Sequence, residues 1–305
     1  MGYYSNLLQQ DYLTLFLFHG VIPVGYNSLL RNYNRKHLSD VYFEDVIKEI
    51  RVSGTPLHFS DAINYLKRGS PFPPNAFVVT FDDGFQNNVD FALPILEKYE
   101  VPSIIYVTTI FSAEQKSSWI DIIEYATESL DIVEIPYSPL YPFCQGTYRS
   151  LEEKRFLLDL IRNEVKSNPN IDPITFADYF RNVTDSMNAY PQSPILDQKI
   201  SPEVLTKLVK HPLVEIGGHS HTHRILGFLS SEEQQYEISS SIALLRKWTN
   251  QDVLHYSYPE GTPNSYNKKT IDILRSHGIV TASTTDKGYN SVETDLFQLR
   301  RYTVT

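Results

Sequence analysis

The stretch Ala76–Gly84 reads AFVVTFDDG, and it decides how the rest of the chain is interpreted. Its first four residues are apolar and rich in Val and Phe, which is the pattern of a buried strand. The strand ends in two adjacent carboxylates, Asp82 and Asp83, at the position where α/β sheets carry their chemistry. Adjacent carboxylates repel each other, so a bound cation, or a metal ligand beside a proton acceptor, would explain the pair. A turn without function is the alternative.

A histidine cluster, His219–His223 (HSHTH), follows a second expected strand and two glycines. Neutral imidazole is the commonest nitrogen ligand of metals in proteins. Two histidines four residues apart, with one carboxylate from elsewhere, form a three-ligand set that leaves positions open for water and substrate. This set is typical of hydrolytic zinc centres. A histidine-rich loop without function is the alternative, and the aspartate pair argues against it.

Strands and helices alternate along both ends of the chain. Apolar runs predict strands over 13–18, 76–79, 213–216 and 253–258 and last strands over 279–283 and 296–304, with helical patterns between them. The alternation predicts a barrel-like parallel sheet. From about 111 to 200, helical runs and a proline-rich middle replace this rhythm. We therefore expect residues 1–305 to form a single domain with a largely helical insertion at about 111–200, whose role the sequence does not indicate.

Composition excludes several classes of function. The 305 residues are 41% hydrophobic and 13% aromatic, which is enough apolar material for a large core. The net charge is -9 and no basic stretch is present, which argues against nucleic acid and against an anionic membrane surface as partners. We expect no membrane insertion, because the first apolar run, Leu13–Phe18, is too short to span a bilayer.

Cysteine content and the N-terminus bear on the compartment. Cys144 is the only cysteine, so the chain has no internal disulfide framework, and this fits a reducing compartment. No positive charge precedes the first apolar run, unlike in a secretory signal peptide. We therefore expect a cytoplasmic protein. The sequence does not predict the oligomeric state.

Two motifs resemble those of a known family. Thr80–Gly84 (TFDDG) resembles the first motif of the polysaccharide deacetylase (NodB-homology) family, the metal-dependent carbohydrate esterases that remove N-acetyl groups from amino sugars. His219, Ser220 and His223 match the second motif, His-Ser/Thr-x-x-x-His, in full. The resemblance covers 13–110 and 201–304, and it implies a distorted (β/α) barrel.

The resemblance also implies roles for these residues. Asp83, His219 and His223 would hold one divalent metal ion, with zinc as the first expectation and nickel, cobalt or iron as alternatives. Asp82 would be the catalytic base. His221 falls on a variable position of the motif, where it would either line the substrate pocket or lie on the surface; the surface position is favoured.

The segment Ser257–Gly261 (SYPEG) resembles the family's third motif, Arg-x-Pro-Tyr-Gly. In the family, the backbone N–H after the proline contributes to the oxyanion hole, which here would be that of Glu260. Ser257 stands where arginine is usual, a departure shared with a subgroup that acts on exopolysaccharides and surface glycans. Ser257 and Tyr258, together with His221, are candidate substrate-binding residues.

The last family motif, Leu-x-His, supplies the general acid, and Arg301 occupies its histidine position. In the exopolysaccharide-like subgroup the acid histidine comes instead from the first strand, in a segment like Leu-x-Tyr/Phe-His. Phe16–His19 (FLFH) matches that segment, so His19 is the expected acid. We expect Arg301 to orient Asp82 in place of the missing arginine of the third motif.

Together these features predict an enzyme, a metal-dependent hydrolase that removes N-acetyl groups, through their amide bond, from an amino-sugar glycan or its precursor. A carbohydrate is the expected partner. Two alternatives stay open. One is a metal-containing but inactive glycan-binding or assembly protein, and the other is an esterase or amidase for a different acyl group. The sequence does not predict which sugar, linkage or chain length is used.

Overall fold

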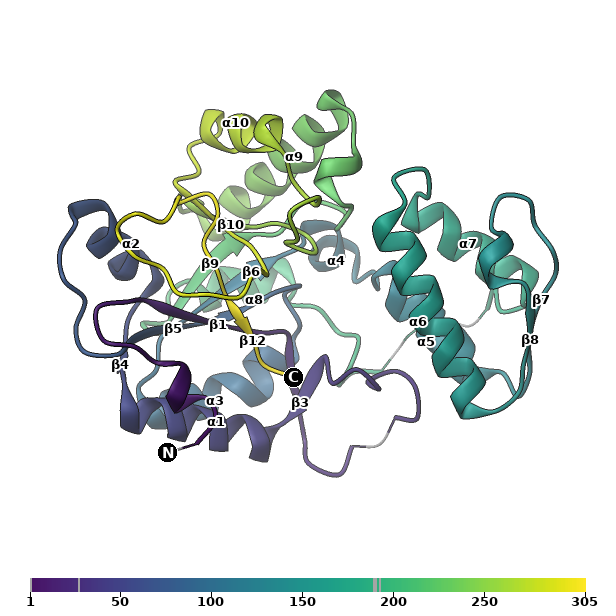
Figure 1. The fold of residues 1–305 in the computed structure, drawn as a ribbon, viewed down its shortest axis with the longest axis horizontal. Coiled ribbons are helices and arrows are strands. Elements are labelled where there is room, and N and C mark those ends of the chain that lie inside the picture. Colours follow the sequence, from purple (N-terminus) through teal and green to yellow (C-terminus); the bar gives the residue numbers. More distant parts are fainter. Residues whose placement is uncertain (1, 27, 189–190, 192) are drawn as a thin grey trace. The chain divides into compact units, whose positions relative to one another are not determined.

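The computed structural model describes residues 2–26, 28–188, 191 and 193–305. It contains two compact units, which we describe separately (Figure 1). The first unit comprises Met1–Gly25, His37–Lys116 and Gln198–Thr305. The second comprises Tyr26–Lys36 and Ser117–Asp197. The second unit thus begins later and ends earlier than the segment 111–200 singled out in the sequence, and it takes in a short piece near the N-terminus as well.

The first unit is built on an eight-stranded sheet in the order β11-β10-β9-β6-β5-β1-β12, with β4 paired to β5. Every strand pairing in this sheet is parallel. The strands are β1 (Thr14–Phe18), β4 (Thr55–Pro56), β5 (Ala76–Phe81), β6 (Ser103–Val107), β9 (Val214–Gly218), β10 (His255–Ser257), β11 (Thr281–Ser283) and β12 (Tyr302–Thr303). A separate parallel ribbon joins β2 (Gly20–Ile22) to β3 (His37–Ser39).

The sheet curls until its two edges share one segment of chain. Ser283 at the end of β11 forms a parallel bridge with Leu299, and Val304 donates a backbone hydrogen bond to Leu17 of β1 at 2.9 Å. The segment 296–304 therefore runs between β11 and β1, as the yellow strand β12 beside the purple β1 shows in Figure 1. The expected distorted (β/α) barrel is the architecture of this unit.

Helices connect and cover the strands of the first unit. They are α1 (Asp40–Ser53), α2 (Phe59–Arg68), the π-helix η2 (Asn88–Ala92), α3 (Leu93–Tyr99), α4 (Thr109–Glu114), α8 (Pro202–Leu208), α9 (Ser231–Thr249) and α10 (Lys268–Ser276), with 3-10 turns η1 (Ser5–Leu7) and η4 (Leu226–Phe228). Local sequence explains α9 well. Ser230 and Glu233 form a reciprocal capping box at its start, and Asn250 adopts a left-handed conformation at its end.

Side-chain alternation along the strands separates two apolar clusters. Phe16 and Phe18 of β1 belong to the larger cluster, which includes Phe43 of α1. Leu15 of the same strand belongs to a smaller cluster around Phe59 at the start of α2. Successive side chains of a strand point to opposite faces, so β1 is buried on both. This explains why its sequence is a continuous apolar run rather than an alternating one.

The second unit is largely helical, with α5 (Trp119–Ser129), α6 (Leu151–Ser167) and α7 (Pro173–Val183). Leu157, Ile161 and Phe176 lie in its own apolar core. The unit also contains an antiparallel hairpin of β7 (Val133–Ile135) and β8 (Gly146–Tyr148), with the 3-10 turn η3 (Pro142–Cys144) between the strands. No sequence pattern indicates this hairpin, because its strands are only three residues long.

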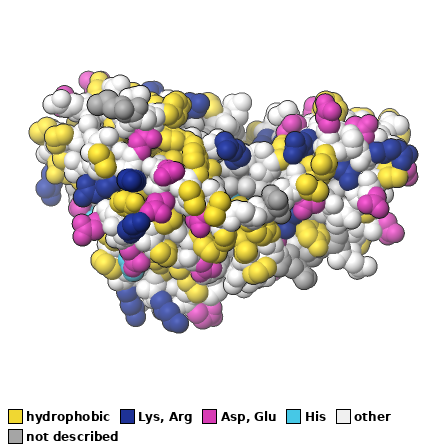
Figure 2. Space-filling view, turned by 90° about the horizontal axis from the view of Figure 1, so that it is seen from below, with side chains coloured by type: hydrophobic (Ala, Val, Ile, Leu, Met, Phe, Trp, Pro, Cys, Tyr) yellow, Lys and Arg dark blue, Asp and Glu magenta, His cyan; other side chains and the backbone are white. Residues whose placement is uncertain are grey.

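Two surface properties bear on partners. Among the described residues, no helix combines the length and the apolar character needed to cross a membrane. Figure 2 shows acidic and basic side chains interspersed on the face that it presents, with hydrophobic side chains between them. On that face, basic side chains alternate with acidic ones and do not merge into the continuous basic patch that nucleic-acid backbones require.

Candidate metal centre

Four neighbouring parallel strands, β1, β5, β6 and β9, end at the same edge of the sheet, where the candidate residues lie. The register of β1 with β5 pairs Phe18 with Phe81, and the backbone N–H of Asp82 then donates to the carbonyl of Phe18 at 3.0 Å. On the other side, His219 follows β9 and donates its backbone N–H to Val107 of β6 at 3.1 Å. The aspartate pair and the histidine cluster therefore meet at the carboxyl edge of the sheet.

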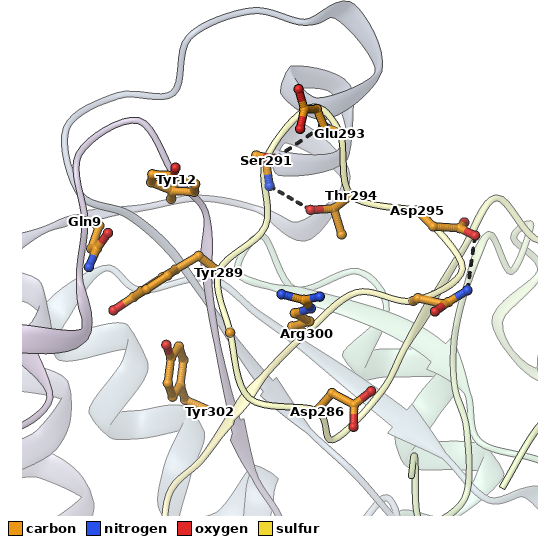
Figure 3. Close-up of a pocket in the computed structure, with 12 residues that line it drawn as sticks. Gln9, Tyr12, Asp286, Tyr289, Ser291, Glu293, Thr294, Asp295, Arg300 and Tyr302 are labelled. Carbon is orange, nitrogen blue, oxygen red and sulfur yellow. Dashed lines mark hydrogen bonds between the residues drawn. The ribbon is translucent and has the colours of Figure 1, made fainter. Parts of the chain in front are cut away.

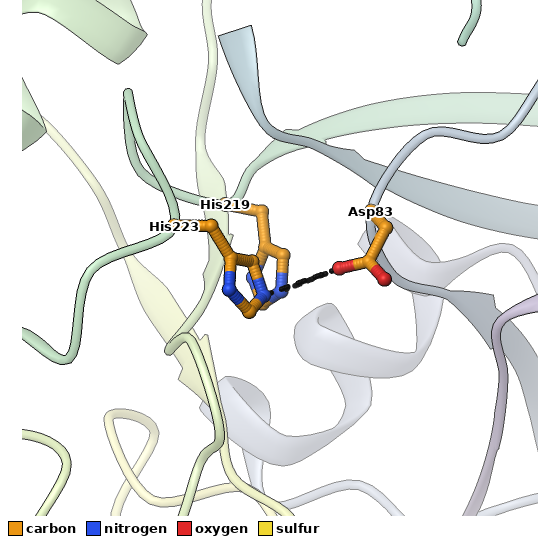
Figure 4. A group of neighbouring side chains, drawn as sticks. All are labelled: Asp83, His219 and His223. Carbon is orange, nitrogen blue, oxygen red and sulfur yellow. Dashed lines mark ion pairs between the residues drawn. The ribbon is translucent and has the colours of Figure 1, made fainter. Parts of the chain in front are cut away.

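Asp83, His219 and His223 converge on one point (Figure 4). The Oδ1 atom of Asp83 lies 3.5 Å from Nε2 of His219 and 3.2 Å from Nε2 of His223. One potential ligand atom from each residue lies within 4.8 Å of the other two. Two imidazole nitrogens and one carboxylate oxygen are a donor set that zinc and similar divalent metals accept, with coordination positions left over. The residues present therefore fit such an ion.

The tautomer of His219 suits this arrangement. Its Nδ1 atom lies 2.8 Å from the backbone carbonyl oxygen of Ser257. A carbonyl oxygen only accepts hydrogen bonds, so Nδ1 carries the proton and Nε2 of the neutral ring keeps its lone pair on the side of Asp83. Metal-binding histidines commonly donate their second nitrogen in this way, which fixes the ring's orientation.

The loop that carries the histidines is held in a tight conformation. Ser220 and His223 have positive φ angles of 64° and 63°, and Asp83 has 73°. Non-glycine residues adopt this region rarely, and such conformations cluster at functional sites, where neighbouring contacts must hold them. One such contact is on the loop itself, because Ser220 Oγ accepts a hydrogen bond from the backbone N–H of His223 at 2.9 Å.

Glu237 of α9 supplies further contacts of the loop. Its carboxylate accepts hydrogen bonds from the backbone N–H groups of His221 (2.9 Å) and Thr222 (2.8 Å), and from the hydroxyl of Thr222 (2.5 Å). Sequence reasoning missed this residue. A signal was present, since Glu237 lies on the face of α9 that Ile238 and Leu245 bury, where a charged residue needs partners.

Asp82 is held by Arg301 rather than by the metal-ligand set. The guanidinium of Arg301 donates to both carboxylate oxygens of Asp82, each at 2.8 Å, and Ser257 Oγ donates to Oδ2 at 3.2 Å. Arg301 is completely buried, and its Nε donates to the backbone carbonyl of Thr284 at 2.7 Å. Burial is the largest single influence on Asp82 and opposes its ionisation. The charge and hydrogen bonds of Arg301, together with the charges of His219 and His19, outweigh burial and lower the pKa of this carboxyl below its ordinary value.

His19 lies next to this pair. It directly follows β1, and its backbone carbonyl accepts a hydrogen bond from the side chain of Asn88 at 2.7 Å. A protonated His19 is among the charges that lower the pKa of Asp82, so the two side chains lie within electrostatic reach of each other. The predicted acid and the predicted base are therefore neighbours at the same edge of the sheet.

Glu260 lies in the turn that follows β10. Its φ angle is 64°, and its carbonyl accepts a hydrogen bond from the hydroxyl of Thr285 at 2.8 Å. Thr285 also donates its backbone N–H to Gly261 at 2.9 Å. These contacts fix the peptide units of the turn, including the one expected to supply an oxyanion contact. That role stays a prediction.

The three residues expected to contact the substrate are buried in the structure, and their roles stay predictions. Tyr258 is fully buried: its hydroxyl donates to the carbonyl of Phe297 at 3.0 Å, and its ring stacks on that of Tyr266 at 4.0 Å. Ser257 is also fully buried and is committed to Arg301 and Asp82. Both side chains are therefore interior groups with partners inside the protein.

His221 is not a surface residue either. It is 8% exposed, its Nδ1 lies 2.9 Å from the hydroxyl of Thr109, and its ring meets that of Tyr236 edge-on. Burial lowers the pKa of His221, so the ring stays neutral near pH 7. The expectation of a surface position was wrong because α4 and α9 both pack against this part of the loop.

Comparison with known proteins places the chain among deacetylase folds. The family model described as "Polysaccharide deacetylase" matches residues 163–282, which include His219 and His223 but not the aspartate pair. No curated protein sequence matches the chain. The matched range is about two fifths of the 305 residues and begins inside the segment that the motif resemblance left out.

Solved structures match nearly the whole chain. The deacetylase PplD of Streptococcus pyogenes, solved in complex with acetate, has a TM-score of 0.61 and 16% identity over 97% of this chain and 93% of its own. IcaB from Ammonifex degensii has a TM-score of 0.59 and 18% identity over 98% of this chain and 94% of its own. The deacetylase domain of BpsB from Bordetella bronchiseptica has a TM-score of 0.56 and 17% identity over 97% of both chains. These likenesses confirm the predicted fold, a distorted (β/α) barrel of the polysaccharide deacetylase type.

Proposed function

We propose that this protein is a metal-dependent hydrolase that removes N-acetyl groups from an amino-sugar-containing glycan or glycan precursor. The observation that carries the proposal is the convergence of Asp83, His219 and His223 beside an ionised, arginine-bound Asp82 at the carboxyl edge of the barrel. The match to the polysaccharide deacetylase model, and the fold shared with structures described as deacetylases, support the same reaction.

Asp83, His219 and His223 are the residues that would hold the metal, which we propose to be zinc, with nickel, cobalt and iron as alternatives. A divalent ion in such a site polarises a carbonyl group and lowers the pKa of water. The positions of these side chains leave Asp82 outside the ligand set, since its Oδ2 lies 4.0 Å from Nε2 of His219 and both its oxygens accept hydrogen bonds from Arg301.

The remaining residues would divide the proton transfers of amide hydrolysis. Asp82 accepts a proton from the attacking water as the new C–O bond forms. The backbone N–H of Glu260 donates to the oxygen that becomes negative in the tetrahedral intermediate. His19, protonated, gives its proton to the sugar nitrogen as the C–N bond breaks, so that acetate and a free amine are released.

Arg301 and Ser257 would act on the base rather than on the substrate. The guanidinium of Arg301 meets the carboxylate of Asp82 through two parallel hydrogen bonds, which fix the plane of the carboxylate as well as its charge. Ser257 accepts a hydrogen bond from Arg301 at 2.8 Å and donates to Asp82, closing a small ring of contacts. Both are positioning residues in this proposal.

The test is acetate release from a panel of N-acetylated oligosaccharides and nucleotide sugars, with metal content measured on the same preparation. We expect release from at least one substrate, and its loss in Asp82→Asn with the metal still bound. Asp45→Asn is the matched control, because Asp45 is an exposed aspartate on α1 and should behave like the wild type.

The outcomes separate the competing functions. Acetate release that survives Asp82→Asn would contradict the assignment of the base. A fully metallated wild-type protein that releases acetate from no member of the panel, but binds glycans, would favour an inactive glycan-binding protein. Release of a different acid from an O-acyl or non-sugar substrate would favour an esterase or amidase.

A further inference from the structure

A cavity of about 510 Å³ lies in the first unit, lined by residues that the proposed reaction does not use (Figure 3). Its walls come from Gln9 and Tyr12, which precede β1, and from the segment 286–302 between β11 and β12. The volume falls within the range of small-molecule sites in proteins, roughly 300–1,000 Å³. None of the predicted metal ligands or catalytic side chains lines it. We call it the tyrosine cavity.

The walls of the tyrosine cavity are tied together by a buried asparagine. Leu13 and Asn290 exchange backbone hydrogen bonds at 2.9 and 3.0 Å, which joins the loop after β11 to the segment before β1. The side chain of Asn290 is fully buried; its Oδ1 accepts from the backbone N–H of Arg300 and its Nδ2 donates to the carbonyl of Arg300, both at 2.9 Å. The cavity is therefore preorganised, which reduces the entropy lost when a ligand binds.

One side of the cavity is aromatic. The ring of Tyr289 lies 5.8 Å from that of Tyr12 and 5.5 Å from that of Tyr302, with interplanar angles of 50° and 53°. Tyr12 is 41% exposed, and the other two rings are half-buried. Figure 3 shows the three rings together on one side of the cavity. The face of a sugar ring carries C–H groups that pack against the negative face of an aromatic ring.

The other side of the cavity carries planar polar groups. Figure 3 shows the guanidinium of Arg300 near the middle, with Asp286 and Glu293 at opposite ends. Across the part of the chain that the structure describes, no hydrogen bond or ion pair engages these three charged groups. Carboxylates and guanidinium groups can bind neighbouring hydroxyls of a sugar in pairs. Three carboxylates (Asp286, Glu293, Asp295) against one guanidinium disfavour an anionic ligand.

The cavity is lined by the residue next to the proposed positioning residue, Arg301, which directly precedes β12. Arg300 and Arg301 are adjacent, so their side chains leave the extended chain on opposite sides. Arg301 is fully buried and reaches Asp82, whereas Arg300 is exposed and lines the cavity. Asp286 is another cavity residue, and its backbone carbonyl accepts a hydrogen bond from the backbone N–H of Arg301 at 2.9 Å.

We propose that the tyrosine cavity is a second saccharide site, which binds an uncharged sugar segment of the glycan at a place separate from the metal centre. The site rests on the proposed function, since a glycan substrate supplies the ligand. Tyr289 packs against the sugar ring, and Arg300, Asp286 and Glu293 bind its hydroxyl and acetamido groups. The site adds affinity for chains longer than the sugar that reacts.

The experiment measures binding of an N-acetylglucosamine tetrasaccharide by calorimetry to the full chain carrying Asp82→Asn, which prevents turnover. We expect Tyr289→Ala to weaken this binding about tenfold or more, which corresponds to the 1.4 kcal/mol that a well-packed aromatic contact can supply. Tyr289→Phe keeps the ring and should stay within about threefold of the parent, which also shows that the cavity folds. Tyr137→Ala, at an exposed tyrosine of the second unit, is the matched control.

Two further binding measurements test where the site lies and which ligand it takes. Removing divalent metal with a chelator should leave the Tyr289-dependent binding unchanged, and a tetragalacturonate, which is anionic, should not bind. Equal binding by Tyr289→Ala and its parent, or loss of all binding on metal removal, would overturn the second site. Tetragalacturonate binding that depends on Arg300 would overturn the uncharged ligand class. Tyr289-dependent binding in a protein that releases no acetate would leave the cavity standing and reject the proposed reaction.

Discussion

The carboxylate of Glu237 is bound to Thr222 by two hydrogen bonds, one from the backbone N–H at 2.8 Å and one from the hydroxyl at 2.5 Å. Thr222 directly precedes His223 in the loop that begins with His219, and Glu237 is 1% exposed. A buried carboxylate that accepts hydrogen bonds from several donors of one loop restricts the conformation of that loop. Glu237 therefore helps to hold the loop that carries the two histidine rings.

We expect Glu237→Gln to weaken metal affinity. Glutamine keeps the size of the side chain, but its NH₂ group cannot accept, so at least one loop donor is left buried without a partner. Loss of such a supporting contact typically costs about 10- to 100-fold in metal affinity. Competition with a chromogenic chelator measures the change.

Gln234→Leu is the control for this prediction. Gln234 lies on the same buried face of α9, where it binds Thr270 and the carbonyl of Leu229 rather than the histidine loop. We expect this variant to lower the melting temperature and leave metal affinity unchanged. Equal metal affinity in Glu237→Gln and the wild type would show that the loop holds its shape without this carboxylate.

The meeting of Asp83, His219 and His223 at one place was predictable because each part of the group is local. Asp83 follows a continuous apolar strand, and His219 and His223 are four residues apart in one loop. Parallel strands bring their carboxyl ends to one edge, so the meeting of the two segments follows from the topology. The capping box at Ser230 marked the start of α9 in the same way.

The environment of the site was not predictable, because it depends on packing between distant segments. His221 occupies a variable position of a motif, and only the contacts with Thr109 and Tyr236 decide that it is buried. Tyr258 is interior because Tyr266 and Phe297 cover it. The attachment of residues 26–36 to the second unit is likewise tertiary, and no local pattern marks it.

Removing the guanidinium of Arg301 should shift the acidic limb of the activity profile to higher pH. The positive charge of Arg301 holds the pKa of Asp82 down against its burial, so the carboxylate of the wild type is ionised throughout the neutral and mildly acidic range. In Arg301→Met this charge and its two hydrogen bonds are lost, so burial raises the pKa of Asp82 above its wild-type value. Activity needs ionised Asp82, so on lowering the pH the variant loses activity at a higher pH than the wild type does. The pH dependence of kcat/KM measures the shift.

Arg301→Lys is the informative companion. It keeps a positive charge but cannot form the two parallel hydrogen bonds to Asp82. We expect it to restore much of the pH profile while kcat stays below the wild type, because the carboxylate is charged but less well oriented. An acidic limb that does not move in Arg301→Met would separate Arg301 from the ionisation of Asp82. Breaking the buried pair should also destabilise the fold by about 3–5 kcal/mol, which denaturation tests.

His19→Ala should abolish deacetylation while the metal stays bound. His19 lies outside the group formed by Asp83, His219 and His223, so its loss removes a proton donor and no ligand. Loss of a general acid costs about 10²- to 10⁴-fold in rate. Acetate release and metal content, measured on the same sample, test both parts of this prediction.

His211→Ala is the control, because His211 lies in the segment before β9 and pairs with Glu97 at 2.9 Å. Turnover retained in His19→Ala would mean that another group protonates the leaving amine.

The second unit should lose stability as pH rises from about 4.5 to 7, because of one buried glutamate. Glu124 of α5 is 2% exposed and forms an ion pair with Arg162 of α6. Burial, which Arg162 only partly offsets, raises the pKa of Glu124 to about 7. Glu124 therefore keeps its proton to a higher pH in the folded unit than in the unfolded chain. The free energy of unfolding is then largest below the pKa of Glu124 in the unfolded chain, and it falls as the pH rises toward 7. The change would be about 3 kcal/mol, at 1.36 kcal/mol per pKa unit.

Trp119 lies in the second unit and Trp248 in the first, so a Trp248→Phe background lets tryptophan fluorescence report the second unit alone. Chemical denaturation at pH 5, 6 and 7 should show the decline, and Glu124→Gln should flatten it because glutamine does not titrate. Glu152→Gln, at an exposed glutamate of α6, should leave the slope as it is. A slope that survives in Glu124→Gln would mean that Glu124 is ionised against Arg162 throughout this range, and that another group binds the proton.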